Sequence, residues 1–481
     1  MLKVSSLIYL KFRIFDRKVM FIMSAKMSKG DMIKWIFQIG IPLIIALIPC
    51  GEVYTMPMKL FFVSTVFAIL CFAFETMDQT VVALILPLFW VFTGVAPATV
   101  AFQPWTQYIP WMMLTGLLLA NVLESSGLLA RIAYFCLVKT GGTYNGIIIG
   151  IALAASFLTL FVGNVVVPMA AFSYGICLAL GTGKTKASAG IMMTAAMGCL
   201  VLNSTKMQGP LLMMGIGQPV TGPLQFLGYF ESFYTMAPVF LEYIIMVLFI
   251  MKFFRPKEDI QGKEFFQQKL NEMGKFTANE IKCGAVLMLF LVYILTKDIH
   301  GLSLEWGMAL IPLLTCIPVI GSATEKDVKR LNYGFVLFIT ACMGIGAVAG
   351  SLGIGQIVVQ LVMPIIEGQS HYVFFLIIWV SLVLLNFVMT PLAMEAAFTI
   401  PFATIATAIG INPMALYYFM MQAVDQIIFP YEYALYLIFF AFGMIHMKDF
   451  IKISGTKMVL NFIMCFALLL SWWNFLGFLF V

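Results

Sequence analysis

Apolar segments of about 20 residues follow one another along most of this sequence, between Ile33 and Val481. Each segment is long enough to cross a hydrocarbon layer about 30 Å thick as an α-helix. Hydrophobic residues make up 62% of the 481 residues and charged residues only 10%, which is more apolar surface than a water-soluble fold can bury. The sequence therefore predicts an all-α polytopic membrane protein with about 11 transmembrane helices and two re-entrant hairpins.

The first 34 residues differ from the rest of the chain, because they carry eight Lys or Arg and only two Asp. Their apolar patches are too short to form the core of a signal peptide. Positively charged segments tend to stay on the cytoplasmic side of a membrane. We therefore expect residues 1–34 to form a basic cytoplasmic tail and residues 35–57 to hold an extra N-terminal helix. The expected location is the inner or plasma membrane of the cell.

Short sequence matches recur at a constant spacing of 226 residues. One such match has little weight in an apolar sequence, but three at one spacing indicate an internal repeat. Repeat 1 is predicted to cover residues 58–253 and repeat 2 residues 284–481, with a cytoplasmic loop over residues 254–283 between them. The three matches are Ala83–Ile85 with Ala309–Ile311, Ser125–Leu128 with Ser351–Ile354, and Phe161, Val162 and Ala170–Phe172 with Phe387, Val388 and Ala396–Phe398.

The distribution of Lys and Arg predicts the orientation of each repeat. Residues 144–180 are long enough to cross the membrane twice, but basic residues flank both ends, which indicates a re-entrant hairpin. Repeat 1 then has five spans and a hairpin, and an odd number of spans makes repeat 2 insert upside down. The second hairpin, residues 370–406, lies in a stretch without Lys or Arg, which places it on the outer side. Lys448, Lys452 and Lys457 are interpreted as marking the cytoplasmic side again.

Four breaks in the apolar segments indicate where a substrate site lies. Two are the hairpin tips, Gly163–Val165 and Met389–Pro391, and two are interrupted helices, over Gly198–Gly209 and Val424–Tyr433. Inverted repeats with broken helices hold their substrate near the middle of the membrane, where the ends of half-helices leave backbone dipoles for ions. We therefore expect a site where these four breaks meet.

Two segments carry a resemblance to a known family. Leu123–Ala133, which reads LESSGLLARIA, and Met447–Lys452, which reads MKDFIK, resemble segments of the divalent anion/sodium symporters. That family, which is similar to solute carrier 13, belongs to the wider ion-transporter superfamily and includes dicarboxylate, citrate and sulfate carriers. The resemblance extends over nearly the whole chain from about Met58. It implies a homodimer in the lipid bilayer in which one domain carries the site across, with a small anionic metabolite and a sodium ion or proton as partners.

The resemblance also implies site residues. In that family each hairpin tip carries Ser-Asn-Thr, whose side chains contact a substrate carboxylate while neighbouring groups hold sodium. This sequence keeps only Asn164 at the first tip and only Thr390 at the second. The candidates for substrate binding are Asn164, Val165, Thr390, Pro391, Ser204, Thr205, Lys206 and Gln426, and those for sodium are Thr159, Gly163, Asn164 and Gly198.

Four ionisable residues fall in or beside the breaks, and an unpaired charge at the centre of a bilayer costs at least about 2.5 kcal/mol. We expect Lys206 to pair with Asp425 or Glu432. Such a pair either stabilises the interface between repeats or supplies a fixed positive charge that holds a carboxylate or carries a proton. Glu395, Asp425 and Glu432 are the candidates for coupling. Arg131, at the end of a segment, is interpreted as interfacial and without a role.

The predicted function is secondary active transport of a small anion, such as a di- or tricarboxylate, by alternating access, coupled to sodium or by exchange. A cation/proton antiporter of the same superfamily stays open, because the acidic residues favour cations whereas Lys206 and the half-helix N-termini favour anions. An enzyme is not expected, since the sequence has no HExxH or GxSxG motif. No cofactor other than a sodium ion is expected, because the nine Cys and three His are too scattered for a metal cluster, and no nucleic-acid partner is expected.

Overall fold

A computed structural model describes residues 29–51, 54–74, 76–161, 165–205, 210–256, 260–354, 369–387 and 390–481. Within these ranges all regular structure is helical, and the extended pairing consists of two isolated bridges, Thr143 with Gln261 and Ile411 with Phe480. The predicted all-α fold is confirmed. Residues 1–28 of the predicted tail lie outside the described residues, and the first described helix, α2, begins at Lys29.

The helices of the first half run from the N-terminal segment to the end of predicted repeat 1. They are α2 Lys29–Leu47, α3 Met56–Phe74, α4 Gln79–Phe92, α5 Ala98–Ala101, α6 Tyr108–Ser125, α7 Leu128–Lys139, α8 Tyr144–Phe161, α9 Val166–Ala179, α10 Lys186–Thr205, α11 Leu211–Thr221, α12 Tyr229–Thr235 and α13 Ala237–Phe253.

The second half contains a polar helix in the loop between the repeats and then the helices of predicted repeat 2. They are α14 Lys263–Glu272, α15 Ala278–Leu295, α16 Lys297–His300, α17 Leu304–Leu310, α18 Glu325–Lys329, α19 Tyr333–Ser351, α21 His371–Leu385, α22 Pro391–Ala408, α23 Pro413–Val424, α24 Ala434–Ala441, α25 Met447–Ile463 and α26 Leu470–Phe475. Short 3-10 turns occur at Gln103–Thr106, Ile311–Cys316 and Pro430–Glu432.

Several helices are suited to a membrane by length and composition. In the described part of the chain, four runs are long and apolar enough to cross one: α15, α19, α22 and the continuous stretch Met447–Phe475. A fifth span results if α6 and α7, which meet at a bend of 64°, are taken together. Nine further apolar helical segments of the described residues are shorter, with 10–17 residues each. Short apolar helices next to breaks are the components of broken spans, so the polytopic character is confirmed, while the total number of spans stays a prediction.

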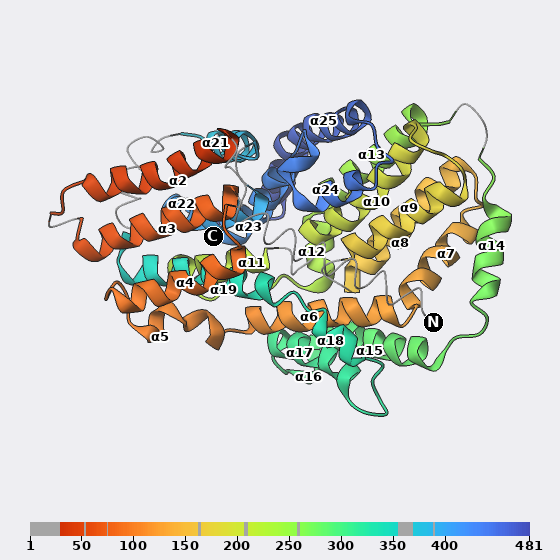
Figure 1. Cartoon of the computed structure of the whole chain (residues 1–481), viewed down its shortest axis with the longest axis horizontal. Coiled ribbons are helices and arrows are strands. Elements are labelled where there is room, and N and C mark those ends of the chain that lie inside the picture. The colour runs from red at the N-terminus through yellow and green to blue at the C-terminus, as the bar shows by residue number, and fades with distance from the viewer. Residues whose placement is uncertain are drawn as a thin grey trace.

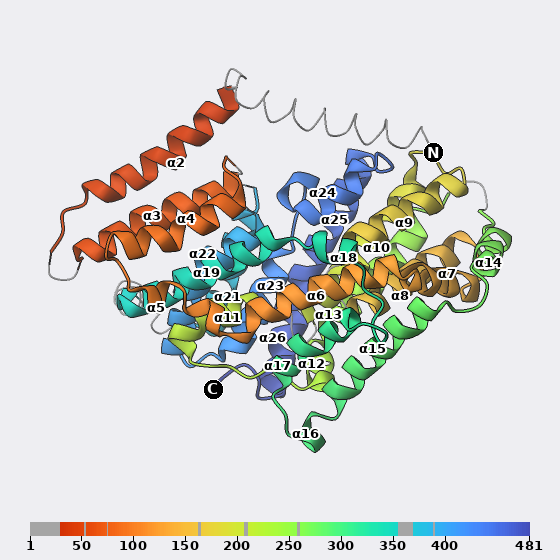
Figure 2. The ribbon, with the colours of Figure 1, turned by 60° about the horizontal axis from the view of Figure 1, so that its bottom comes forward.

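The chain forms an elongated body with different helices at its two ends (Figure 1). Helices α2–α5 lie at one end, and α7, α8, α9 and α14 lie at the other. Helix α6 runs along one side between the two ends, while α23, α24 and α25 occupy the middle (Figures 1 and 2). Helix α2 lies at the outer edge beside α3 and exposes large apolar side chains such as Ile36 and Ile44. Such side chains are suited to contact with lipid.

The helices recur at the spacing of the sequence matches. Helices α6, α8, α9 and α10 begin within one residue of the positions that lie 226 residues before α19, α21, α22 and α23. The match at Ser125–Leu128 has a structural cause, because Gly127 ends α6 with a left-handed backbone (φ 86°) and Gly353 follows α19 in the same way (φ 70°). Glycine is the residue that adopts this conformation at a helix end without strain. The opposite orientation of the two repeats and the re-entrant course of the hairpins stay predictions.

Candidate functional site

The second interrupted helix is present where the sequence placed it. Helix α23 ends at Val424, the chain continues without α-helix through Asp425, and α24 begins at Ala434. The carboxylate of Glu432 accepts hydrogen bonds from the backbone N–H groups of Ile428 and Phe429, both at 3.0 Å. Glu432 therefore holds the break in its folded-back shape by satisfying two backbone donors.

Asn386 joins this break to the second hairpin. It caps the C-terminal end of α21, and its side-chain amide donates to the carbonyl oxygens of Val424 (3.1 Å) and Gln426 (3.0 Å). The tip residue Met389 lies outside the described residues, but Thr390 follows directly and begins α22. One buried side chain thus ties the end of α21, in the predicted second hairpin, to the interrupted helix after α23. Sequence reasoning missed Asn386, although its position three residues before the tip was a usable signal.

Several buried oxygens around this junction lack partners within the described structure. The side-chain oxygen of Asn386, Oε1 of Gln426 and Oδ1 of Asp425 are buried and accept no hydrogen bond there. The amide of Gln426 is held in place because it donates to the carbonyl of Gln422 at 2.7 Å. Buried acceptors are normally satisfied, so this junction suits hydrogen-bond donors from water or from a ligand.

The N-terminal end of α22 forms the described part of the second tip. Thr390 caps the helix, since its hydroxyl oxygen accepts from the N–H of Ala393 at 3.4 Å, and Pro391 takes the first helical position. Glu395 lies one turn further along α22 and is buried, and its carboxylate makes no hydrogen bond or ion pair with other described residues. A carboxylate in this position is costly unless it is protonated or meets a ligand.

The first tip is described only at its edges. Thr159 is fully buried in α8 and donates its hydroxyl hydrogen to the carbonyl of Ala155 at 2.8 Å. Val165 is buried at the N-cap of α9. Gly163 and Asn164 lie outside the described residues, so their predicted contacts with sodium and substrate stay predictions.

The first interrupted helix differs from the expected one. The break was predicted to begin at Gly198, but α10 continues to Thr205. A side chain at Gly198 would lie 2.7 Å from the hydroxyl of Tyr243 and 2.8 Å from Cβ of Ala155. The glycine is therefore explained by the close approach of α8 and α13 to α10, as small residues permit between membrane helices. Its role as a sodium ligand stays a prediction.

The remaining residues of this segment are only partly described. Thr205 is fully buried at the end of α10. The side chain of Ser204 and the whole of Lys206 lie outside the described residues. The predicted pairing of Lys206 with Asp425 or Glu432 therefore stays a prediction.

Asp425 has a partner that the sequence did not indicate. The ammonium group of Lys457 lies 2.6 Å from Oδ2 of Asp425 and donates to the carbonyl of the same residue at 2.8 Å. Lys457 was interpreted as marking the cytoplasmic side, but the residue is buried and does not belong to an exposed basic cluster, and its side of the membrane stays a prediction. It lies ten residues after the start of α25 at Met447, about 15 Å along the helix.

A second buried carboxylate lies next to this pair. Glu242 on α13 accepts a hydrogen bond from the side-chain amide of Asn461 on α25 at 2.9 Å. Asn461 in turn accepts from the indole N–H of Trp379 on α21 at 3.1 Å. Sequence reasoning also missed Glu242 and Asn461, although an acidic residue inside the apolar α13 is by itself a signal. Lys457 and Asn461 lie four residues apart and so share one face of α25.

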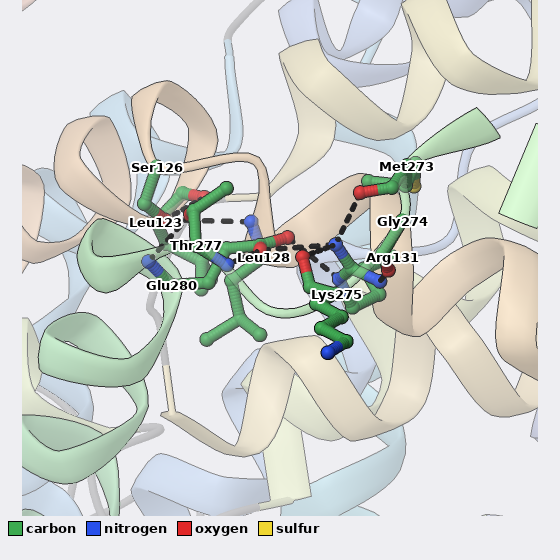
Figure 3. Close-up of polar contacts among 9 residues, drawn as sticks. All are labelled: Leu123, Ser126, Leu128, Arg131, Met273, Gly274, Lys275, Thr277 and Glu280. Carbon is green, nitrogen blue, oxygen red and sulfur yellow. Dashed lines mark hydrogen bonds and ion pairs between the residues drawn. The ribbon is translucent and has the colours of Figure 1, made fainter. Parts of the chain in front are cut away.

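Arg131, interpreted as interfacial and without a role, forms a buried ion pair and so has a structural role, while its place at the membrane interface stays a prediction (Figure 3). Its guanidinium group contacts both carboxylate oxygens of Glu280, at 2.7 and 3.0 Å. It also donates to the carbonyl oxygens of Met273, Gly274 and Lys275. This cluster fastens α7, which precedes the predicted first hairpin, to the start of α15 at the end of the predicted loop between the repeats.

Comparison with known proteins identifies the family of the chain. The model of a family described as the sodium:sulfate symporter transmembrane region matches residues 29–479. The chain belongs to this family. A search of curated proteins found no match.

A solved structure with a related fold is that of the YdaH transporter of Alcanivorax borkumensis, described as having an unusual topology. The two folds superpose with a TM-score of 0.54 over 81% of this chain and 89% of the other, at 16% sequence identity. At this identity the likeness shows the fold alone.

Membership in the sodium:sulfate symporter family confirms the resemblance seen in the sequence. The chain is a multi-pass membrane protein of a family that transports anions. Among the predicted site residues, Asp425 and Gln426 lie in the break that Asn386 ties to the end of α21, four residues before Thr390. That Thr390 and Pro391 join them in one site stays a prediction. The residues of the first tip and Lys206 are not described together.

Proposed function

We propose that the protein carries a small di- or tricarboxylate across the cytoplasmic membrane by alternating access, coupled to sodium or by exchange. The observation that supports this most is the junction at Asn386, which connects a hairpin tip to a broken helix within a member of an anion transporter family. Transporters built in this way bind their substrate at such junctions.

Local chemistry at the second tip supports an anionic substrate. In the first turn of α22, Pro391 has no N–H and those of Ala393 and Met394 donate to the hydroxyl and the carbonyl of Thr390. The remaining N–H, that of Leu392, together with the positive end of the helix dipole, attracts a carboxylate. The unpartnered oxygens of Asn386 and Gln426 accept hydrogen bonds from water or from a substrate hydroxyl group. Thr205, Ser204, Lys206, Asn164 and Val165 are proposed to complete the substrate contacts, with Thr159, Gly163 and Asn164 as the sodium ligands.

A cation/proton antiporter of the same superfamily is the second candidate. The observation that favours it is the burial of three carboxylates, Glu242, Glu395 and Asp425, in the middle of a membrane protein. Buried acidic residues of this kind are common in proton and cation pathways. The assembly is proposed to be a homodimer with cytoplasmic N-termini.

Uptake of radiolabelled succinate into proteoliposomes tests the proposal. Four conditions are compared, with and without an inward sodium gradient and with and without unlabelled dicarboxylate inside. Accumulation driven by sodium would support symport, and uptake only against internal dicarboxylate would support exchange. Unlabelled citrate and sulfate, added as competitors, identify the preferred anion.

Failure to transport or bind any of the three anions would contradict the proposal. If succinate, citrate and sulfate are all neither transported nor bound, the anion proposal fails. Sodium-dependent or potassium-dependent proton movement in the same vesicles, measured with a trapped pH indicator, would then establish the antiporter.

A further inference from the structure

A buried cluster of charges joins helices of the two predicted repeats and includes Asp425 from the break beside Asn386. It contains Glu242 on α13, Asp425 at the end of α23, and Lys457 and Asn461 on α25. Helices α13 and α25 pack against each other in the middle of the molecule (Figure 1). The side chains of Lys457 and Asp425 are only 6% and 12% exposed, and Glu242 is 4% exposed. The cluster is therefore almost completely removed from water.

The charges in this cluster do not balance. Lys457 carries one positive charge and lies on Asp425, whereas Glu242 and Asp425 together carry two negative charges when both are ionised. Among the described residues no other Lys or Arg makes an ion pair with either carboxylate. The Oδ1 oxygen of Asp425 is buried and has no described partner. An uncompensated carboxylate in a dry interior binds a proton or another cation.

The hydrogen-bond donors around Glu242 decide between a proton and a metal ion. The indole N–H of Trp379 can only donate, and the side-chain oxygen of Asn461 accepts its hydrogen bond at 3.1 Å. This bond fixes the orientation of the Asn461 amide. The amide N–H of Asn461 therefore points to Glu242, at 2.9 Å. Asp425 is approached by an ammonium group. Donors and a positive charge repel a metal ion, which needs several oxygen ligands, whereas a proton needs only one carboxylate oxygen.

Groups on the other packed elements add no positive charge. The described titratable groups close to the cluster are Tyr433 and Tyr436 near the start of α24, Cys465 after α25 and Cys199 on α10, and the hydroxyl of Tyr436 makes no hydrogen bond within the described structure. Neutral hydroxyl and thiol groups of this kind leave the excess negative charge in place. Lys206 follows α10 directly and lies outside the described residues, so it enters the test below.

We propose that Glu242 and Asp425, held by Lys457 and Asn461, form a site for one exchangeable proton, which is bound when a carboxylate becomes a carboxylic acid and released when it ionises again. Because Asp425 lies in the break that Asn386 ties to the second tip, occupancy of this site is coupled to the shape of the substrate junction. Coupling of anion movement to this proton rests on the proposed function, whereas proton binding itself does not.

The test is infrared difference spectroscopy of the purified full-length protein in lipid nanodiscs, recorded between acidic and alkaline pH without substrate. A buried protonated carboxyl group gives a carbonyl band at higher frequency than exposed carboxyl groups, and the band shifts in heavy water. We expect one such band that titrates in the native protein and is lost in Glu242→Gln or shifted in Asp425→Asn. Lys457→Met, which removes the positive charge, should move the titration toward alkaline pH by at least one pH unit.

Glu395→Gln and Lys206→Met are the matched variants, since Glu395 is a buried carboxylate outside the cluster and Lys206 is a charge whose position is not described. Loss of the titrating band in Glu395→Gln but not in Glu242→Gln or Asp425→Asn would overturn the proposal. So would a native spectrum without such a band that gains one in Lys206→Met, because Lys206 would then compensate the cluster. Removal of the band by sodium chloride, but not by choline chloride, would replace the proton by a metal ion. None of these results depends on whether the protein transports dicarboxylates.

Discussion

At the scale of single residues, Asn386 is the side chain on which the substrate junction depends. Asn386→Ala removes both hydrogen bonds to the buried carbonyl oxygens of Val424 and Gln426. Each unsatisfied buried carbonyl costs about 1–3 kcal/mol, so the break should lose its fixed position relative to the tip. We expect substrate uptake to fall at least tenfold, and the affinity for the transported anion to fall with it. Radiolabel uptake and binding in detergent measure both quantities.

Asn412→Ala is the matched control for this prediction. Asn412 also bridges distant segments, because its side-chain amide donates to the carbonyl of Phe478 at 3.0 Å, but it lies at the other end of α23. This variant should lower the melting temperature without a comparable loss of uptake per folded molecule. Equal losses of uptake in both variants would mean that Asn386 only stabilises the fold.

The same scale shows what a sequence can indicate about a site. Asp425 was recognised as a buried charge because it interrupts an apolar segment, and the structure buries it. Its partner Lys457 was missed, because it lies only nine residues after Lys448 and, with Lys452 between them, the three lysines look like one cytoplasmic cluster. Only the start of α25 at Met447 shows that the third of them has entered the interior. Pairing between residues far apart in sequence depends on tertiary packing, which local patterns do not contain.

At the scale of helices, the cluster around Arg131 should hold α7 and α15 together (Figure 3). Glu280→Ala leaves a buried guanidinium group without its anion and removes the capping interaction with Thr277. We expect a loss of about 2–3 kcal/mol in stability, measured as thermal unfolding in detergent. Arg131→Lys should lose part of this amount, because an ammonium group cannot contact both carboxylate oxygens and the three carbonyls at once.

The exposed pair of Lys269 and Glu272 on the neighbouring α14 supplies the control. Their charged groups are 2.7 Å apart, but both side chains are largely in water. Ion pairs of this kind contribute little, so Lys269→Ala should leave the melting temperature nearly unchanged. A shift as large as that of Glu280→Ala would show that the whole loop region, and not the buried pair, sets the stability.

Glycine has two structural uses in this chain that the sequence did not separate. Gly127 and Gly353, found in the sequence as part of a repeat match, follow the ends of α6 and α19 with left-handed backbone. Gly198 was predicted to begin a break but lies inside α10, because a glycine in a membrane helix also serves close packing. The two uses of glycine differ only in the neighbours that the fold brings to it.

At the scale of the whole molecule, the strongest untested expectation is the opposite orientation of the two repeats. Thr143 and Gln369 are equivalent at the spacing of 226 residues, and both are exposed just before the first helix of a predicted hairpin. If the repeats are inverted, the two positions face opposite sides of the membrane.

Thr143→Cys and Gln369→Cys are therefore introduced separately into a protein whose nine cysteines are replaced by Ser or Ala, including the exposed Cys50 and Cys316. In intact cells a membrane-impermeant maleimide should label the cysteine at position 369 and not the one at 143, and permeabilisation should expose both. Lys269→Cys, in the predicted cytoplasmic loop, should behave like position 143. If positions 143 and 369 are labelled from the same side, the repeats are parallel. The positive charges from which the orientation of the second repeat was predicted, which include the buried Lys457, then did not carry topological information.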